Sequence, residues 1–266
     1  MKLKLHVISF GQSGYYFDIA QDFLSRFRSI YKESSIYCYS EHDLPVEIIN
    51  YSKIHKRGYG YWQWKPYIIL KELNKMNNGD ILLYADGRSH VIRKNADIHW
   101  LEEFLNSRFD IVLHNGFAEG NYTTQKVLEY FEVVNDSYIT KSKQYFAGLL
   151  LMKKSEEIVK LIQTWYEVIT TNAELFRDDD NNDPNNINDF VENRHDQSAL
   201  SILLKKNQNL EIGSFSDLSN TNIVTHFKFK KGRYSKLFNF TRMVIPGGLF
   251  IKSYNLFRKI KLLINK

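Results

Sequence analysis

The sequence has one cysteine, only four prolines among 266 residues and no long apolar run. Cys38 has no second cysteine to pair with, so an internal disulfide is excluded, and this fits a reducing compartment. A membrane-spanning helix needs about 20 consecutive apolar residues, and no segment of the sequence approaches that length. The opening MKLKLHVIS holds too short an apolar stretch for a secretory signal peptide, so we expect a strand there and a cytoplasmic protein.

Acidic residues are missing from the end of the chain. After Asp217 there are eleven lysines and arginines and no aspartate or glutamate. Since the whole chain carries +6, residues 1–217 carry −5, which gives a mildly acidic body with a basic end. An acidic body without a recognised DNA- or RNA-binding motif argues against nucleic acid as a partner.

The basic end also carries a helical pattern. From Leu249 onward, apolar residues recur at helical spacing, with lysines and arginines on the other faces. Such a helix can lie on an anionic membrane surface, or it can cover a neighbouring domain, and the sequence leaves both alternatives open. We therefore expect one domain over residues 1–235 and a basic amphipathic tail over residues 236–266.

Strand patterns alternate with helix patterns along the body. Near-continuous apolar stretches predict buried strands, and apolar residues at helical spacing predict helices. The predicted strands are 3–9, 35–40, 80–86, 109–115 and 144–154, and the predicted helices are 16–31, 66–76, 155–170 and 195–206. This alternation predicts an α/β fold with a mostly parallel central sheet flanked by helices.

Residues 177–189, RDDDNNDPNNIND, form the one low-complexity segment. A calcium-binding EF-hand loop needs Gly at its sixth position and Glu at its twelfth. Counted from Asp178, these positions hold Asp183 and Asp189. We therefore expect a mobile polar loop here.

The segment RGYGYWQWKPYIIL, residues 57–70, concentrates aromatic side chains beside two glycines and a proline. The glycines allow a tight turn, and the aromatic rings offer flat faces of the kind that pack on sugars or bases. Lys65 stands where a helix begins, a position that favours a phosphate. Trp62 and Trp64 can instead be core residues that fasten this helix to the sheet.

Four conspicuous features fall at the ends of predicted strands or in the loops beside them. They are the turn after Phe10, residues 86–88, residues 146–148 and residues 195–197. Ligands of open α/β sheets bind at the carboxyl ends of strands, so we expect these four segments to meet in one site. Asp86 ends a buried strand, where its carboxylate can hold a divalent metal or a sugar hydroxyl, or can cap the next turn.

The segment KPYIILKELNKMNNGDILLYAD, residues 65–86, resembles bacterial glycosyltransferases of the GT-A fold that build surface polysaccharides such as capsule and O-antigen. Residues 144–154 and the stretch NRHDQSALSILLKK, residues 193–206, are similar to later blocks of the same enzymes. The resemblance covers about residues 3–230. It implies a nucleotide-sugar donor, most simply a UDP-sugar, and a glycan or lipid-linked acceptor at the inner face of the membrane.

The resemblance, together with the residue patterns themselves, gives expected roles for individual residues. Asp86 is expected to bind the donor and a divalent Mn²⁺ or Mg²⁺, with His226 as a second metal ligand or a surface residue. Asp196 is expected to be the general base or the N-cap of its helix. The expected donor-binding residues are Ser9, Phe10, Trp64, Lys65, Asp86, Arg88 and Gln197, and the expected acceptor-binding residues are His195 and Gln197.

Two departures from the family pattern bear on these roles. A full Asp-x-Asp motif needs an acid at position 84, where this chain has Tyr84, and Gly87 is followed by Arg88. The incomplete motif puts the metal in doubt, and an arginine can contact a diphosphate through two parallel hydrogen bonds. It also raises the alternative of a catalytically inactive sugar-nucleotide or glycan-binding protein.

Overall fold

A computed structural model of the chain describes residues 4–87, 89–91, 99–218 and 224–226. The chain divides into two compact units, residues 1–226 and residues 227–266. The second unit, and with it the predicted tail at 236–266, lies outside the described residues. The description below concerns the first unit.

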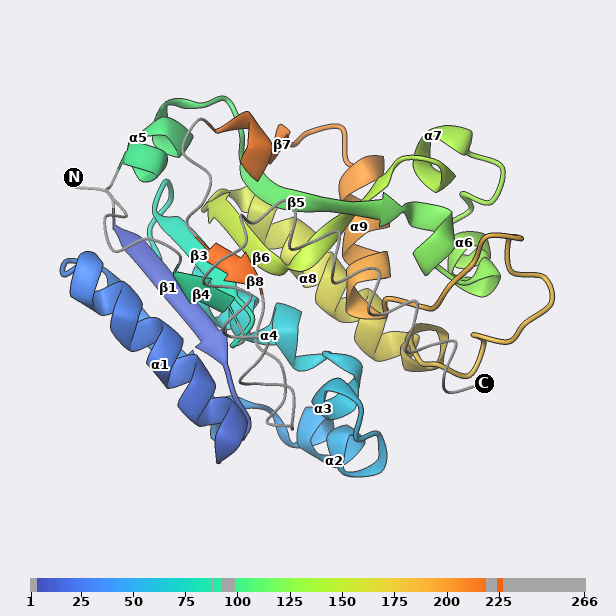
Figure 1. Ribbon diagram of the computed structural model, residues 1–266, viewed down its shortest axis with the longest axis horizontal. Coiled ribbons are helices and arrows are strands. Elements are labelled where there is room, and N and C mark those ends of the chain that lie inside the picture. The colour runs from blue at the N-terminus through green and yellow to red at the C-terminus, as the bar shows by residue number, and fades with distance from the viewer. Residues whose placement is uncertain (1–3, 88, 92–98, 219–223, 227–266) are drawn as a thin grey trace, which may run out of the picture. The chain divides into compact units, whose positions relative to one another are not determined.

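A six-stranded sheet in the order β2-β1-β3-β6-β5-β7 forms the centre of this unit (Figure 1). Its strands are β1 Leu5–Phe10, β2 Ser35–Tyr39, β3 Ile81–Ala85, β5 Ile111–Ala118, β6 Lys143–Lys153 and β7 Ile212–Ser214. Three of the five neighbouring pairs are parallel, and β6 runs antiparallel to both β3 and β5. The predicted α/β class with a mostly parallel sheet flanked by helices is confirmed. A second, two-stranded sheet pairs β4 Ser89–Val91 with β8 Val224–His226.

Helices connect these strands. The α-helices are α1 Tyr15–Ile30, α2 Val46–Ile54, α3 Gly58–Tyr61, α4 Trp64–Leu73, α5 His99–Asn106, α6 Gln125–Tyr130, α7 Ser137–Thr140, α8 Glu156–Thr171 and α9 Asp196–Lys206. Short 3-10 turns occupy η1 Glu41–Asp43, η2 Glu119–Tyr122, η3 Ala173–Phe176 and η4 Phe215–Asp217. Helix α4 begins two residues before Pro66, which sits in the first turn, where its missing N–H leaves no intrahelical bond unmade.

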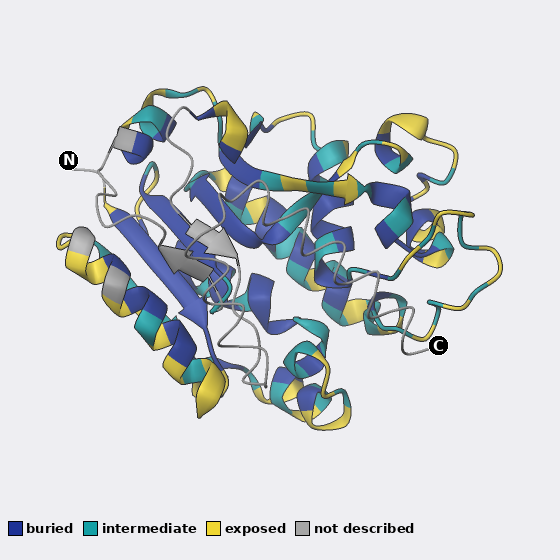
Figure 2. Ribbon diagram, in the orientation of Figure 1, coloured by how far each residue is buried: buried dark blue, intermediate teal, exposed yellow. Residues whose placement is uncertain are grey.

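Each face of the sheet packs against its own set of helices, and the central strands β1 and β3 are buried along their whole length (Figure 2). Helices α1 and α5 share one apolar cluster, and helices α4, α8 and α9 share the other. Along β3, Leu82 and Tyr84 belong to the α4 and α9 cluster, whereas Leu83 belongs to the opposite one. Asp86 continues this alternation, so its side chain lies on the face that α4 and α9 cover.

A buried polar cluster centred on Glu72 joins β1, β2 and α4. His6 Nδ1 lies 2.8 Å from Glu72 Oε1, and the Tyr39 hydroxyl donates to Oε2 at 2.6 Å. The Lys75 ammonium donates to the same Oε2 at 3.1 Å. Burial raises the pKa of Glu72, but these hydrogen bonds outweigh it and lower the pKa to about 2. The cluster is thus held by one ionised carboxylate.

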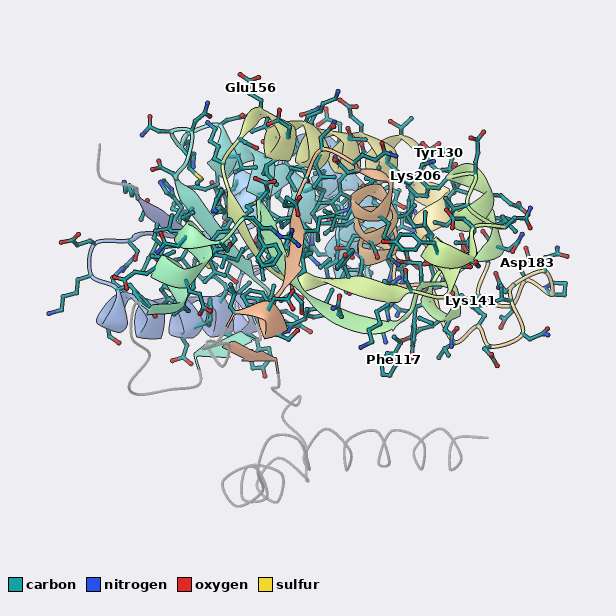
Figure 3. All side chains as sticks on the ribbon, turned by 90° about the horizontal axis from the view of Figure 1, so that it is seen from above. Phe117, Tyr130, Lys141, Glu156, Asp183 and Lys206 are labelled. Carbon is teal, nitrogen blue, oxygen red and sulfur yellow. The ribbon has the colours of Figure 1, made fainter. Side chains whose placement is uncertain are left out.

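The variant Glu72→Gln is expected to lower the free energy of unfolding at neutral pH by ~2–3 kcal/mol, because the cluster loses its charged acceptor. A carboxylate with a depressed folded-state pKa contributes stability above its unfolded pKa, and this contribution is lost as the pH falls toward about 2. In urea denaturation, the difference between the two proteins should therefore shrink from about pH 5 downward. The matched control is Glu156→Gln, whose side chain is exposed (Figure 3); a constant difference at all pH values would contradict the assignment.

Candidate functional site

Asp86 follows β3 and lies against β6. The Tyr84 hydroxyl donates to Asp86 Oδ1 at 2.5 Å, and the Asp86 backbone N–H donates to the Gly148 carbonyl at 2.9 Å. A Cβ atom at position 148 would lie 2.8 Å from Asp86 Oδ2, so only glycine lets the carboxylate approach β6 this closely. The Asp86 side chain is 26% exposed, which makes it the most accessible charged group of the site.

Lys65, the second residue of α4, lies between two carboxylates. Its Nζ is 2.8 Å from Asp196 Oδ2 and 3.6 Å from Asp86 Oδ1, while its side chain is 4% exposed. Burial lowers the pKa of Lys65, but Asp196 and Asp86 more than offset this and raise the pKa above its usual value. Lys65 is therefore a buried ammonium at neutral pH.

Asp196 is the first residue of α9, with His195 at the N-cap position. Burial raises the pKa of Asp196 to about 6; the Lys65 ammonium acts in the opposite direction, and the Asp86 carboxylate adds to the rise. Its Oδ2 is in ion-pair contact with Lys65, although no described residue completes a hydrogen bond of good angle to that atom. The indole N–H of Trp165 donates to the Asp196 carbonyl at 2.9 Å and fixes the start of the helix.

The end of β1 and the start of α9 lie at the same end of the sheet as Asp86. Ser9 Oγ donates to the Ala85 carbonyl at 2.8 Å, and the Phe10 ring stacks on Trp64 with centroids 4.0 Å apart. Gln197 Oε1 accepts from the Ala147 backbone N–H at 3.3 Å. The four segments that the sequence predicts to meet thus lie next to one another, through the contacts Ser9–Ala85, Asp86–Gly148 and Ala147–Gln197. The roles assigned to Ser9, Phe10 and Gln197 stay predictions.

His195 is buried beside the site. Its ring is 3% exposed, and Nε2 lies 3.0 Å from Asp178 Oδ1. Burial lowers the pKa of His195 to about 4, against the opposing hydrogen bond to Asp178. The imidazole is therefore neutral at physiological pH and donates its Nε2 proton to an ionised carboxylate. A direct contact of His195 with an acceptor stays a prediction.

Residues 58–62 form a left-handed turn, so the segment labelled α3 is not a right-handed α-helix. The φ angles are 56° at Gly58, 54° at Tyr59, 83° at Gly60, 50° at Tyr61 and 61° at Trp62. A left-handed conformation costs a residue with a Cβ about 1–2 kcal/mol. A Cβ at Gly58 would lie 2.4 Å from the Trp62 ring, so glycine is required there.

The aromatic residues of this segment differ in exposure. Trp64 is 5% exposed and belongs to the core, where its indole N–H donates to the Gly58 carbonyl at 2.9 Å. Tyr59, Tyr61 and Trp62 are half-buried. The solvent-accessible aromatic surface of this segment therefore belongs to these three residues, and a donor contact by Trp64 stays a prediction.

Arg88 lies outside the described residues, and so does the side chain of His226. The backbone of β8 places His226 opposite Ser89, three residues after Asp86. Their predicted roles therefore stay predictions.

The resemblance implies a divalent cation on Asp86 and His226, and the described side chains around Asp86 can be compared with that expectation. In the described ranges no group of three or more His, Cys, Asp and Glu side chains is arranged to hold a metal. Asp196 is paired with Lys65, and Tyr84 donates a hydrogen bond where a second carboxylate would stand. The Lys65 ammonium, 3.6 Å from Asp86 Oδ1, repels another cation at that oxygen. The described side chains by themselves therefore do not form a site for a divalent ion, and the metal on Asp86 and His226 stays a prediction.

Sequence reasoning placed residues 146–148 in the site but gave Gly148 no role of its own, and it noted Tyr84 only as a departure from the acidic motif. The two-residue alternation of β3 could have identified Tyr84, because it shares a sheet face with Asp86. Gly148 carries no such signal, since its role depends on the antiparallel pairing of β6 with β3. Asp178 was assigned to a mobile loop, although its carboxylate contacts Arg57 and His195.

No protein-family model matches the chain, and neither does any curated protein. Several solved structures are similar. The galactosyltransferase LgtC, in complex with donor and acceptor sugar analogs, is 12% identical with a TM-score of 0.41, over 91% of this chain and 98% of that chain. A core-mannan synthase from Aspergillus fumigatus in its Mn/GDP form is 10% identical with a TM-score of 0.45, over 82% and 74%. Mouse xyloside xylosyltransferase 1 is 8% identical with a TM-score of 0.41, over 80% and 85%.

Within the described ranges, none of the helices combines the length and the apolar character that crossing a membrane requires.

Proposed function

We propose that the protein is a GT-A-type glycosyltransferase that moves a sugar from a nucleotide-diphosphate donor, most simply a UDP-sugar, to a growing or lipid-linked polysaccharide. One observation carries the proposal. Asp86 at the end of β3, Lys65 at the start of α4 and Asp196 at the start of α9 form a continuous charged cluster at the carboxyl ends of β1 and β3. This is where an α/β sheet binds its ligands, and two of the three groups are buried.

The cluster supplies the groups that such a transfer needs. The exposed part of the Asp86 carboxylate accepts hydrogen bonds from sugar hydroxyls. The Lys65 ammonium stabilises negative charge that develops on the departing diphosphate. Asp196, with a pKa of about 6, accepts the proton of the acceptor hydroxyl if the reaction inverts the sugar carbon. We place the reaction in bacterial surface-polysaccharide synthesis, at the cytoplasmic face of the membrane.

A panel of nucleotide-sugars tests the donor class. The full-length protein is mixed with UDP-, GDP-, ADP- and CMP-sugars, and its unfolding temperature is measured with manganese and with EDTA. A donor present at 100 times its dissociation constant stabilises the protein by about 2.7 kcal/mol. We expect UDP-sugars to raise the unfolding temperature both with manganese and with EDTA. If none of the nucleotide-sugars raises it, the proposal is contradicted.

A second candidate is a catalytically inactive protein that binds a sugar-nucleotide or a glycan within a synthesis complex. The pairing of Asp196 with Lys65 favours it, because an ion-paired carboxylate is a weaker base. The absence of an acid at position 84 favours it as well. Slow release of free sugar from the donor, measured without any acceptor, separates the two, since a pure binding protein releases none.

The rate of transfer is expected to rise with pH through about 6, where Asp196 loses its proton. The folded chain holds this proton more tightly than the unfolded chain, so the contribution of Asp196 to stability is largest at low pH and is lost as the pH rises through about 6. The variant Asp196→Asn should lose transfer and this step in the pH profile of stability together. If the variant keeps the same step in its pH profile of stability, the step belongs to another titrating group.

A further inference from the structure

Two segments with unusual backbone conformations lead directly into the charged cluster. The left-handed turn over residues 58–62 ends three residues before Lys65. His195 has φ 55° and ψ −121°, a conformation that residues with a Cβ rarely adopt, and it immediately precedes Asp196. The positions of Lys65 and Asp196 therefore depend on whether these two segments keep their conformations.

The carboxylate of Asp178 joins the two segments. Its Oδ2 accepts from Arg57 Nη1 at 2.7 Å and from the Tyr61 hydroxyl at 3.2 Å. Its Oδ1 lies 3.0 Å from His195 Nε2. Burial raises the pKa of Asp178, but His195 and Arg57 outweigh this and lower it, so the carboxylate is ionised at neutral pH.

The aromatic rings of the two segments are also in contact. The His195 ring lies 5.2 Å from the ring of Tyr61 and 5.1 Å from that of Trp62, centroid to centroid. The strained turn 58–62 and His195 are thus in direct contact, and Asp178 is bonded to both. Strained conformations persist only where surrounding contacts hold them, and Asp178 supplies the charged ones here.

The loop that carries Asp178 is itself fixed by hydrogen bonds. Asn181 Oδ1 accepts from the Asn193 backbone N–H at 2.9 Å, and Asn193 Nδ2 donates to the Arg177 carbonyl at 3.1 Å. Asp180 pairs with Lys126 at 2.6 Å. The acidic segment predicted as a mobile loop is therefore anchored on both sides of Asp178.

We infer that Asp178 is a positioning residue: by clamping the left-handed turn 58–62 to His195, it holds Lys65 and Asp196 at ion-pair distance. This inference rests on the proposed function for its catalytic consequence only. Asp178 touches neither Lys65 nor Asp196 and acts through the two segments that precede them. Its loss should release both segments together, although they lie far apart in the sequence.

Hydrogen exchange followed by mass spectrometry tests the clamp without any substrate. In Asp178→Ala, peptides covering residues 55–65 and 193–200 are both expected to exchange at least tenfold faster, while peptides of β1 and β3 keep their protection. The control is Asp183→Asn in the same loop, whose carboxylate accepts from the Asn185 backbone N–H at 2.9 Å and lies at the outer edge of the fold (Figure 3). Unchanged exchange in either peptide of Asp178→Ala would overturn the inference.

Kinetics separate positioning from a general loss of stability. A misplacement of about 1 Å in catalytic groups can lower turnover by up to ~100-fold, so Asp178→Ala should lower kcat at least tenfold. Asp178→Asn keeps an acceptor oxygen toward Arg57 and Tyr61 and should recover part of that loss. Equal kcat in Asp178→Ala and Asp183→Asn would overturn the positioning role. If the wild-type chain transfers no sugar, the proposed function fails, while the exchange experiment still decides the clamp.

Discussion

Replacing Lys65 with methionine is expected to reduce sugar transfer at least ~100-fold, because the one buried cation of the cluster is removed from the departing diphosphate. The same change leaves Asp86 and Asp196 facing each other without compensation. Breaking a buried ion pair by removing one partner typically costs about 3–5 kcal/mol. Part of this cost is relieved when Asp196 takes up a proton, since Lys65 is the group that holds its pKa down.

Two further variants make the Lys65 result interpretable. The double variant Lys65→Met with Asp196→Asn removes both charges, so it should regain most of the lost stability yet remain inactive. Lys71→Met in the same helix is the matched control, since Lys71 is 33% exposed and its pair with Asp43 is worth less than about 1 kcal/mol. Urea denaturation and transfer assays are run on all three. Full activity in Lys65→Met would remove Lys65 from the mechanism.

Asp86→Asn is expected to lower transfer by at least ~100-fold with a change in unfolding free energy below about 1 kcal/mol. Asparagine keeps an oxygen that accepts the Tyr84 hydroxyl, so the buried phenol stays bonded. The negative charge of Asp86 is lost, while Lys65 keeps its closer partner Asp196 at 2.8 Å. The measurement pairs initial rates of transfer with the unfolding midpoint, and a near-normal rate would refute the assignment of Asp86.

The other end of the same strand provides the control for Asp86. The Asp80 carboxylate accepts from the backbone N–H groups of Lys4 and Asn77 and is 2% exposed. Asp80→Asn should therefore reduce stability by about 1–2 kcal/mol while the rate per folded molecule stays unchanged. Lost transfer with unchanged stability in Asp86→Asn, and lost stability with unchanged transfer in Asp80→Asn, would show that the two carboxylates have different roles.

The sequence was informative wherever a local pattern determines local structure. The apolar run that ends at Asp86 predicted β3, which spans Ile81–Ala85, and the periodicity after Ser155 predicted α8, which spans Glu156–Thr171. Ser155 is the N-cap of that helix, as expected, and accepts from the Ile158 backbone N–H. Helices α5, α6 and α7 were not predicted, because their patterns are too short to stand out from loops.

The conformation of the left-handed turn 58–62 could be predicted only in part from its own sequence. Gly58 and Gly60 predicted a tight turn, but Tyr59, Tyr61 and Trp62 share its positive φ against their own preference. Tyr61 is bonded to Asp178, the rings of Tyr61 and Trp62 lie against His195, and Tyr59 lies beside Phe10; all three partners are distant in sequence.

The sequence by itself determined the α/β class, the main strands and the placement of Asp86 at a strand end, because side-chain periodicity follows from the geometry of one element at a time. Tertiary structure alone decided that β6 runs antiparallel, that Lys65 pairs with Asp196 and that Asp178 bonds to two strained segments. The reason is that burial, ion pairing and pKa depend on which faces of different elements pack together, and no single element carries that information.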